Sequence, residues 1–148
     1  MFYIENNHSL IGFALVLAAA LTAAIFDVRT RRIPNALVIA LFAGGLAVNA
    51  LAGWQFAAVD AIVTIAVLIA GTAAFALGLI GGGDIKLLAA AAGTLGFPAA
   101  AWFVLFTFVS GGVIAVFFSA ARGTLSATVA NVRGLALPMA AGAPEDPA

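Results

Sequence analysis

Two aspartates, Asp27 and Asp84, stand where long apolar runs meet short polar breaks in a chain with few charged residues. Asp27 closes the first hydrophobic run, and Asp84 follows a glycine triplet. An ionisable side chain at the end of a membrane helix is costly, so it marks a candidate functional site. If the fold brings the two carboxyl groups together, one can hold a proton while the other stays charged. Such a pair can activate water and a peptide carbonyl, which is the chemistry of an aspartic hydrolase.

Each aspartate also has a purely structural interpretation. Asp27 can pair with the arginines that follow it at a membrane interface, an exposed arrangement that contributes little to stability. Asp84 can act as a helix N-cap, where its carboxylate would accept amide hydrogen bonds. Neither structural role excludes catalysis. Asp60, in contrast, is predicted to be an interfacial cap before the third apolar run.

Composition predicts a membrane protein. The chain has 148 residues, of which 65% are hydrophobic and 8% charged, and its mean hydropathy is +1.21. In a typical soluble domain about a quarter of the residues are charged. We therefore expect a single domain over residues 1–148, surrounded by the lipid bilayer. No basic tail or patch favours nucleic acid. With no cysteine and His8 as the one histidine, the sequence offers no thiolate nucleophile and no His-based metal site, so we expect no metal or cofactor.

Apolar runs position the two aspartates. Most of these runs are close to the roughly 20 residues that an α-helix needs to span a bilayer. The predicted fold class is all-α, a polytopic transmembrane helical bundle of five to six membrane helices with its N-terminus outside. Residues 53–55 are predicted to form a turn, and the glycine triplet to break the helix before Asp84. The fourth run is short for a full span. The runs are residues 10–26, 36–52, 61–80, 85–97 and 99–121.

The C-terminal part of the chain is harder to interpret. Arg133 and Pro138 interrupt a moderately apolar stretch. Residues 125–137 can therefore form either an interfacial helix or part of a sixth span. Residues 143–148 are polar and are predicted to be disordered.

The distribution of positive charge predicts the topology. With the N-terminus outside, all six basic residues lie on the cytoplasmic side, as membrane proteins prefer. The same assignment places Asp27 and Asp84 on one face of the membrane, where they could share a substrate. The basic residues are Arg29, Arg31, Arg32, Lys86, Arg122 and Arg133.

The residues around the two aspartates form two motifs. The first is Asp27-x-Arg-x-x-x-Ile-Pro-Asn, and the second is Gly81-Gly82-Gly83-Asp84-Ile85-Lys86. In this order, and in so hydrophobic a chain, they resemble the two signatures of type IV prepilin peptidases. Members of that family are intramembrane aspartic proteases of the Gly-x-Gly-Asp type. The resemblance covers most of residues 10–121.

The resemblance implies that Asp27 and Asp84 form a catalytic dyad. The other motif residues would have supporting roles, and the glycines would give the loop freedom to bring Asp84 to the scissile bond. A glycine triplet can equally be a simple helix break. The supporting residues are Gly81, Gly82, Gly83, Lys86, Pro34 and Asn35.

The resemblance also implies the substrate and its location. Prepilins, each with a basic leader and a hydrophobic helix, would be cut at the cytoplasmic face of the bacterial inner membrane, with the pilus assembly machinery as a further partner. Larger bifunctional relatives carry a cytoplasmic region with cysteines and also N-methylate the new terminus. This chain has no cysteine and only a short segment between Val28 and Asn35. It is therefore similar to the short, peptidase-only branch found in tight-adherence (Flp) pilus systems.

Two other interpretations stay open at the level of sequence. The first is a small transporter that uses Asp27 and Asp84 as a proton or cation site, because membrane carboxylates often have that role. The second is a catalytically inactive assembly factor for a pilus machine. A transporter requires access to the aspartates from both sides of the membrane, whereas a peptidase requires cytoplasmic access only.

Overall fold

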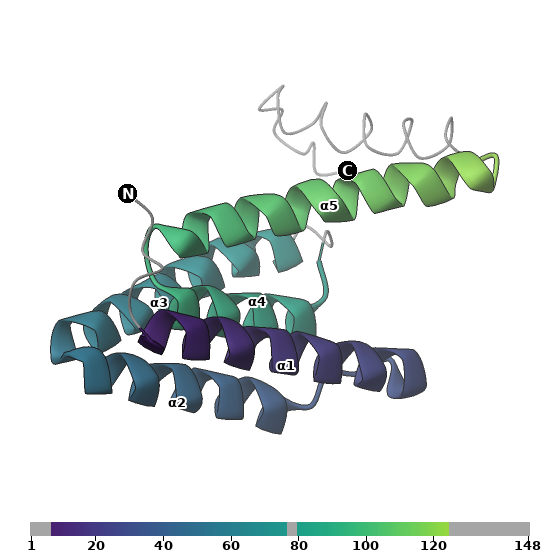
Figure 1. Cartoon of the computed structure of the whole chain (residues 1–148). Helices are drawn as coiled ribbons and strands as arrows, with labels where there is room; N and C mark the ends of the chain where they lie inside the picture. Colours follow the sequence, from purple (N-terminus) through teal and green to yellow (C-terminus); the bar gives the residue numbers. More distant parts are fainter. Residues whose placement is uncertain (1–6, 77–79, 125–148) are drawn as a thin grey trace, which may run out of the picture. The chain divides into compact units, whose positions relative to one another are not determined.

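The computed structural model describes residues 7–76 and 80–124, and all the regular secondary structure in these ranges is helical. This confirms the all-α fold class. The predicted helix or span at residues 125–137 and the predicted tail at 143–148 lie outside the described residues. Figure 1 shows the helices in chain order: α1 (Asn7–Thr30), α2 (Asn35–Ala52), α3 (Trp54–Ala76), α4 (Gly82–Leu95) and α5 (Ala99–Ala121).

Four of these helices, α1, α2, α3 and α5, are long and apolar enough to cross a membrane by length and composition. The fourth helix, α4, has 14 residues and is about 21 Å long at 1.5 Å per residue. It is therefore shorter than the roughly 30 Å hydrocarbon core, as the short fourth run predicted. Large apolar side chains on the long helices are exposed, including Leu17, Ile69 and Phe117, as a surface surrounded by lipid requires.

The chain divides into two units, residues 1–105 and residues 106–148. In the first unit, α4 is the central helix, and α1, α2 and α3 pack against it. The run Ala89–Thr94 is buried without interruption. Because an α-helix turns once every 3.6 residues, six consecutive buried residues mean that α4 is covered on all sides. Its small side chains allow this close approach.

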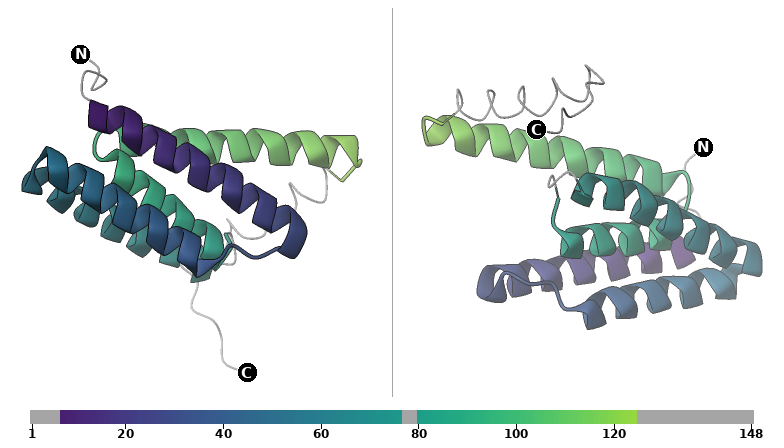
Figure 2. Two further views of the ribbon diagram at one scale, coloured as in Figure 1. Left: turned by 60° about the horizontal axis from the view of Figure 1, so that its bottom comes forward. Right: turned by 180° about the vertical axis from the view of Figure 1, so that it is seen from behind.

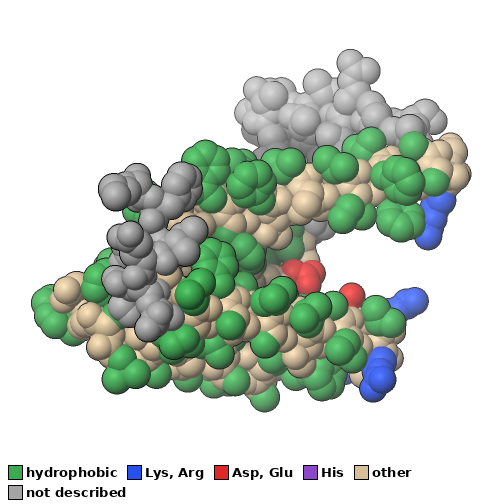
Figure 3. Space-filling view, in the orientation of Figure 1, with side chains coloured by type: hydrophobic (Ala, Val, Ile, Leu, Met, Phe, Trp, Pro, Cys, Tyr) green, Lys and Arg blue, Asp and Glu red, His purple; other side chains and the backbone are tan. Residues whose placement is uncertain are grey.

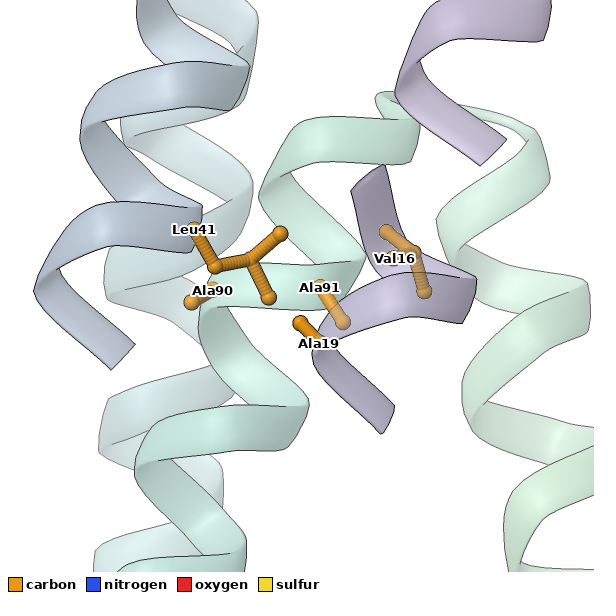
Figure 4. Close-up of a cluster of buried hydrophobic side chains, with 5 residues drawn as sticks. All are labelled: Val16, Ala19, Leu41, Ala90 and Ala91. Atoms are coloured by element: carbon orange, nitrogen blue, oxygen red, sulfur yellow. The ribbon is translucent and has the colours of Figure 1, made fainter. Parts of the chain in front are cut away.

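The hydrophobic core of the first unit joins α1, α2 and α4. Val16 and Ala19 of α1 meet Ala91 of α4, and Leu41 of α2 lies beside Ala90 (Figure 4). Partly buried apolar side chains surround this cluster, among them Phe103 from the first turns of α5. In the core, α4 is thus packed against both α1 and α2.

In the first unit, short connections make α1, α2 and α3 successively antiparallel, as Figure 2 shows for α1 and α2. The α1–α2 connection begins at Arg31, whose φ of 52° lies in the left-handed region. Gly53 alone connects α2 to α3, with a φ of 149° that favours glycine. The contacts described below show that the α1–α2 and α3–α4 connections share one end of the bundle.

The structure corrects three of the predicted helix boundaries. α1 continues to Thr30, so Asp27 lies inside its last turn. α3 begins at Trp54, so the predicted turn at residues 53–55 is reduced to Gly53. Asp60 is therefore inside α3 and fully buried, and the prediction of an interfacial cap was wrong. α4 begins at Gly82, because glycines in its first turn still adopt helical backbone angles.

The second unit contains the rest of α5. Within residues 106–124, the side chains are exposed apart from a half-buried Ser119. The rings of Phe117 and Phe118 meet edge to face at 6.0 Å. The Arg122 guanidinium lies 5.9 Å from the centre of the Phe118 ring, a cation–π geometry at the end of the helix.

Candidate functional site

Asp27 lies in the last turn of α1, where the chain is about to reverse. Its carbonyl oxygen accepts a hydrogen bond of 2.8 Å from the N–H of Arg31, the residue with left-handed backbone. The Thr30 hydroxyl donates to the carbonyl oxygen of Phe26 at 2.9 Å. These bonds close the helix just after Asp27, whose side chain is exposed.

Asp84 lies in the first turn of α4. Gly81 is the N-cap residue, and its carbonyl oxygen accepts from the N–H of Ile85 at 3.2 Å. Asp84 is therefore not the N-cap but a residue of the first turn. Its negative charge is favoured there by the helix dipole. Its carboxylate turns back over Gly81: a Cβ atom built on Gly81 would lie 2.9 Å from Asp84 Oδ2. The exposed Asp84 is followed by Ile85, which is buried and packs against Gly71 of α3.

Two contacts bring the predicted motifs together. A Cβ atom built on Gly83 would lie 3.6 Å from the Cβ of Ile33, so the α1–α2 connection packs directly on the start of α4. The ammonium group of Lys86 donates to the side-chain oxygen of Asn35 at 3.5 Å. Because Ile33 follows the last turn of α1 and Gly83 precedes Asp84, both aspartates lie at this end of the bundle.

Pro34 fixes the entry into α2 at the same place. It is the N-cap residue, with extended backbone angles (φ −64°, ψ 130°), and its carbonyl oxygen accepts from the N–H of Leu37 at 3.1 Å. Proline already holds φ near this value, so the turn costs little conformational entropy. Asn35 is then the first residue of α2, which aims its side chain at Lys86.

The exposed charges of the first unit gather around these contacts. Figure 3 shows acidic side chains toward the same end of the first unit as Lys and Arg side chains. Among the described acidic residues, Asp60 is fully buried, so the exposed carboxylates belong to Asp27 and Asp84. The site thus has two exposed carboxylates at the end of the bundle that also carries a lysine and several arginines. The three residues before Asp84 are glycines and add no side chains to it.

Sequence reasoning missed one polar cluster, which lies toward the other end of the bundle. Asn49 donates to Asp60 Oδ2 at 3.4 Å and to the carbonyl oxygen of Thr94 at 3.2 Å. The Thr64 hydroxyl donates to Asp60 Oδ1 at 3.4 Å. The available signal was the spacing of Asp60 and Thr64, four residues apart on one apolar helix, which places both side chains on the same face.

The comparisons with known proteins agree with the motifs. The sequence model of the type IV leader peptidase family matches residues 14–116, a range that includes both aspartates and the contacts between their motifs. No curated protein and no solved structure gives a significant match. The family match spans well over half of the chain, and the chain therefore belongs to the type IV leader peptidase family.

Proposed function

We propose that this protein is an aspartic endopeptidase that removes the leader peptide from type IV or Flp-type prepilins at the cytoplasmic face of the membrane. Asp27 and Asp84 would be the catalytic pair. The observation that carries the proposal is the contact between the two motif segments, Ile33 against Gly83 and Lys86 with Asn35. It supports a shared site because Asp27 belongs to one of the two contacting segments and Asp84 to the other.

The proposed chemistry needs one ionised and one protonated carboxyl group. The ionised aspartate takes a proton from a water molecule, whose oxygen attacks the carbonyl carbon of the scissile peptide. The protonated aspartate gives its proton to the carbonyl oxygen, which yields a tetrahedral diol without a covalent enzyme intermediate. When the C–N bond breaks, the first aspartate gives its newly acquired proton to the leaving nitrogen, and the second takes a proton from a diol hydroxyl. The pair thereby returns to its starting state.

The environment of the pair favours a substrate with a long apolar helix. The helices that flank the site have exposed apolar side chains, so a substrate helix can remain in lipid beside them. The missing side chains of Gly81, Gly82 and Gly83 leave the backbone beside Asp84 open to approach by another chain. A basic leader would remain on the cytoplasmic side under the positive-inside assignment.

We further propose that the enzyme lacks methyltransferase activity. Only residues 31–34 connect α1 to α2, and the sequence has no cysteine. This supports a peptidase-only enzyme, since the bifunctional relatives that the sequence resembles carry an extra cytoplasmic region with cysteines. The intact mass of a processed pilin tests the point: the expected mature N-terminus is unmethylated, and a methylated product would contradict the proposal.

Co-expression with candidate prepilins tests the activity. The wild-type protein should shorten a prepilin by its leader, whereas Asp27→Asn and Asp84→Asn should insert normally and leave the prepilin uncut. Glu5→Gln removes a carboxylate outside both motifs and should leave cleavage intact. Normal cleavage by either aspartate variant would refute the assignment of the pair.

Single cysteines test the orientation, because the natural sequence has none. Arg32→Cys should react with a membrane-impermeant thiol reagent only from the cytoplasmic side. Trp54→Cys, at the start of α3, should react only from the opposite side. Reaction of an Asp27→Cys variant from both sides would instead favour the transporter, which needs access from both compartments. Insertion without cleavage of any pilin-like precursor would favour an inactive assembly factor.

A further inference from the structure

The polar cluster in the bundle connects three helices through Asp60 and Asn49. Asp60 of α3 accepts from Asn49 of α2 and from Thr64 one turn farther along α3. Asn49 also donates to the carbonyl oxygen of Thr94 in α4. Every buried side-chain nitrogen and oxygen in the described residues has a hydrogen-bond partner. The cluster is thus a closed network inside an apolar bundle.

Glycines let α4 interlock with this network. A Cβ atom built on Gly93 would collide with Thr64 Oγ1 and Asp60 Oδ1, and would lie 2.9 Å from the Asp60 carbonyl oxygen. A Cβ atom built on Gly45 of α2 would collide with Thr94 Oγ1 and lie 2.8 Å from its Cβ. The end of α4 is therefore held by one hydrogen bond and by two close contacts at which glycine leaves room for a side chain of the neighbouring helix.

The middle of α4 has only small side chains to oppose movement along its axis. Ala89–Ala92 present only methyl groups to the neighbouring helices, and such small side chains form shallow ridges. Hydrogen bonds, in contrast, are directional and weaken when the donor or acceptor moves. The network at Asn49 and Asp60 is thus suited to fixing the axial position of α4.

Movement of α4 would reach Asp84 directly. Thr94 and Asp84 are on the same helix, ten residues apart in sequence, which corresponds to about 15 Å of helical rise. A slip of one residue would move Asp84 by about 1.5 Å relative to α1, which carries Asp27. Misplacement of a catalytic group by about 1 Å can reduce a rate a hundredfold.

We propose that the cluster of Asn49, Asp60, Thr64 and Thr94 is a positioning device that fixes α4 along the bundle axis and thereby sets Asp84 against Asp27. The kinetic part rests on the proposed peptidase function, whereas the position of α4 can be measured without it. In this role Asp60 acts as a hydrogen-bond acceptor. Asp60→Asn should therefore preserve the device, with its oxygen toward Asn49 and its amide toward Thr64, and Asp60→Leu should break it.

A disulfide between the motif segments reports the position of α4. The Cβ positions of Ile33 and Gly83 are 3.6 Å apart, within the range that a disulfide requires, and the chain has no other cysteine. In an Ile33→Cys/Gly83→Cys background, oxidation should give a high cross-linking yield. Adding Asp60→Leu should lower the initial rate of disulfide formation about threefold or more, because a disulfide forms only over a narrow range of Cβ–Cβ distances. Adding Asp60→Asn, or the control Ile62→Ala on the exposed face of α3, should not change it.

Cleavage kinetics with a purified prepilin supply the second measurement. For Asp60→Leu we expect kcat to fall about tenfold or more with KM within about twofold, because the catalytic geometry changes while the substrate contacts remain. Asp60→Asn should keep kcat within about twofold of the wild type. Thr64→Val removes one hydrogen bond with little change of shape, so it should show a smaller effect in the same direction. It also provides the test if Asp60→Leu does not insert.

Three results would overturn the proposal. The first is unchanged cross-linking in well-inserted Asp60→Leu and Thr64→Val variants. The second is an altered cross-linking rate with unchanged kcat, which would show that the position of α4 does not control the placement of Asp84. The third is a loss in Asp60→Asn as large as in Asp60→Leu, which would show that the ionisable carboxyl group itself is needed. If the wild type cleaves no prepilin but the cross-linking results hold, the proposed function fails and the fixing of α4 stands.

Discussion

The ammonium group of Lys86 donates a hydrogen bond to the side-chain oxygen of Asn35, 3.5 Å away, across 51 positions of sequence. Lys86 lies two residues after Asp84, and side chains at that spacing point to different faces of a helix. The bond therefore draws the lysine toward α2 and away from the Asp84 carboxylate. It joins the last residue of the first motif to the last residue of the second.

The Lys86–Asn35 bond is expected to affect cleavage more than stability. Both side chains are exposed, and a single hydrogen bond contributes only about 0.5–1.5 kcal/mol even in favourable cases. Lys86→Met and Asn35→Leu should each lower the melting temperature in detergent by little, while prepilin cleavage falls severalfold as the segments loosen. The double variant should lose no more than the worse single variant, since both remove one interaction. Arg122→Met, which removes a cation in the second unit, is the control, and additive losses would contradict a direct coupling.

The glycine triplet should respond unequally to alanine. At Gly81 a methyl group would lie 2.9 Å from Asp84 Oδ2, whereas at Gly82 it would meet Phe75 Cε2 at an ordinary 3.5 Å. The Asp84 side chain can rotate away, so Gly81→Ala should insert with a nearly unchanged melting temperature. The Asp84 carboxylate would then be displaced, and cleavage should fall at least about tenfold because the catalytic group is no longer correctly placed. Gly82→Ala should lose much less, and equal activity of the two variants would show that the carboxylate orientation seen here is not the reactive one.

That the two motifs lie at the same end of the bundle could be predicted from sequence, because alternating spans and the positions of Arg29 and Lys86 favour one side for both. Their direct contact could not, since it depends on how α4 packs against the α1–α2 connection. The buried role of Asp60 could not. Its interpretation as a cap assumed that α3 starts just after it, whereas one glycine, Gly53, suffices for the turn and the helix begins six residues earlier. A carboxylate at the start of an apolar run and one in the second turn of a helix look alike in sequence, and only packing against α2 and α4 distinguishes them.

Adjacent glycines in α2 provide a test of that packing. Gly45 faces α4, and a methyl group there would lie 2.8 Å from the Cβ of Thr94, while Gly44 faces Leu15 at a comfortable 3.6 Å. Gly45→Ala should therefore destabilise the protein by about 1–3 kcal/mol, the usual cost of overpacking. Gly44→Ala should be neutral or stabilising by up to about 1 kcal/mol, because alanine is the better helix former. Unfolding of both variants in detergent measures the difference, and equal stability would mean that α2 and α4 are less closely packed than described.

Arg31 is expected to be a site where glycine stabilises the fold. Its φ of 52° closes α1 after Asp27, and left-handed backbone costs a residue with a side chain roughly 1–2 kcal/mol. Arg31→Gly removes that strain, but the more flexible unfolded chain offsets part of the gain, so a net stabilisation of about 0.5–1 kcal/mol is expected. Arg32→Gly removes the same charge at a position without positive φ, so it should give no gain. Because Asp27 precedes this turn by four residues, retained cleavage in Arg31→Gly would show that the turn's conformation, and not the arginine side chain, holds the aspartate in place. A loss of stability in Arg31→Gly that Arg32→Gly does not share would instead mean that the Arg31 side chain makes a stabilising contact greater than the backbone strain.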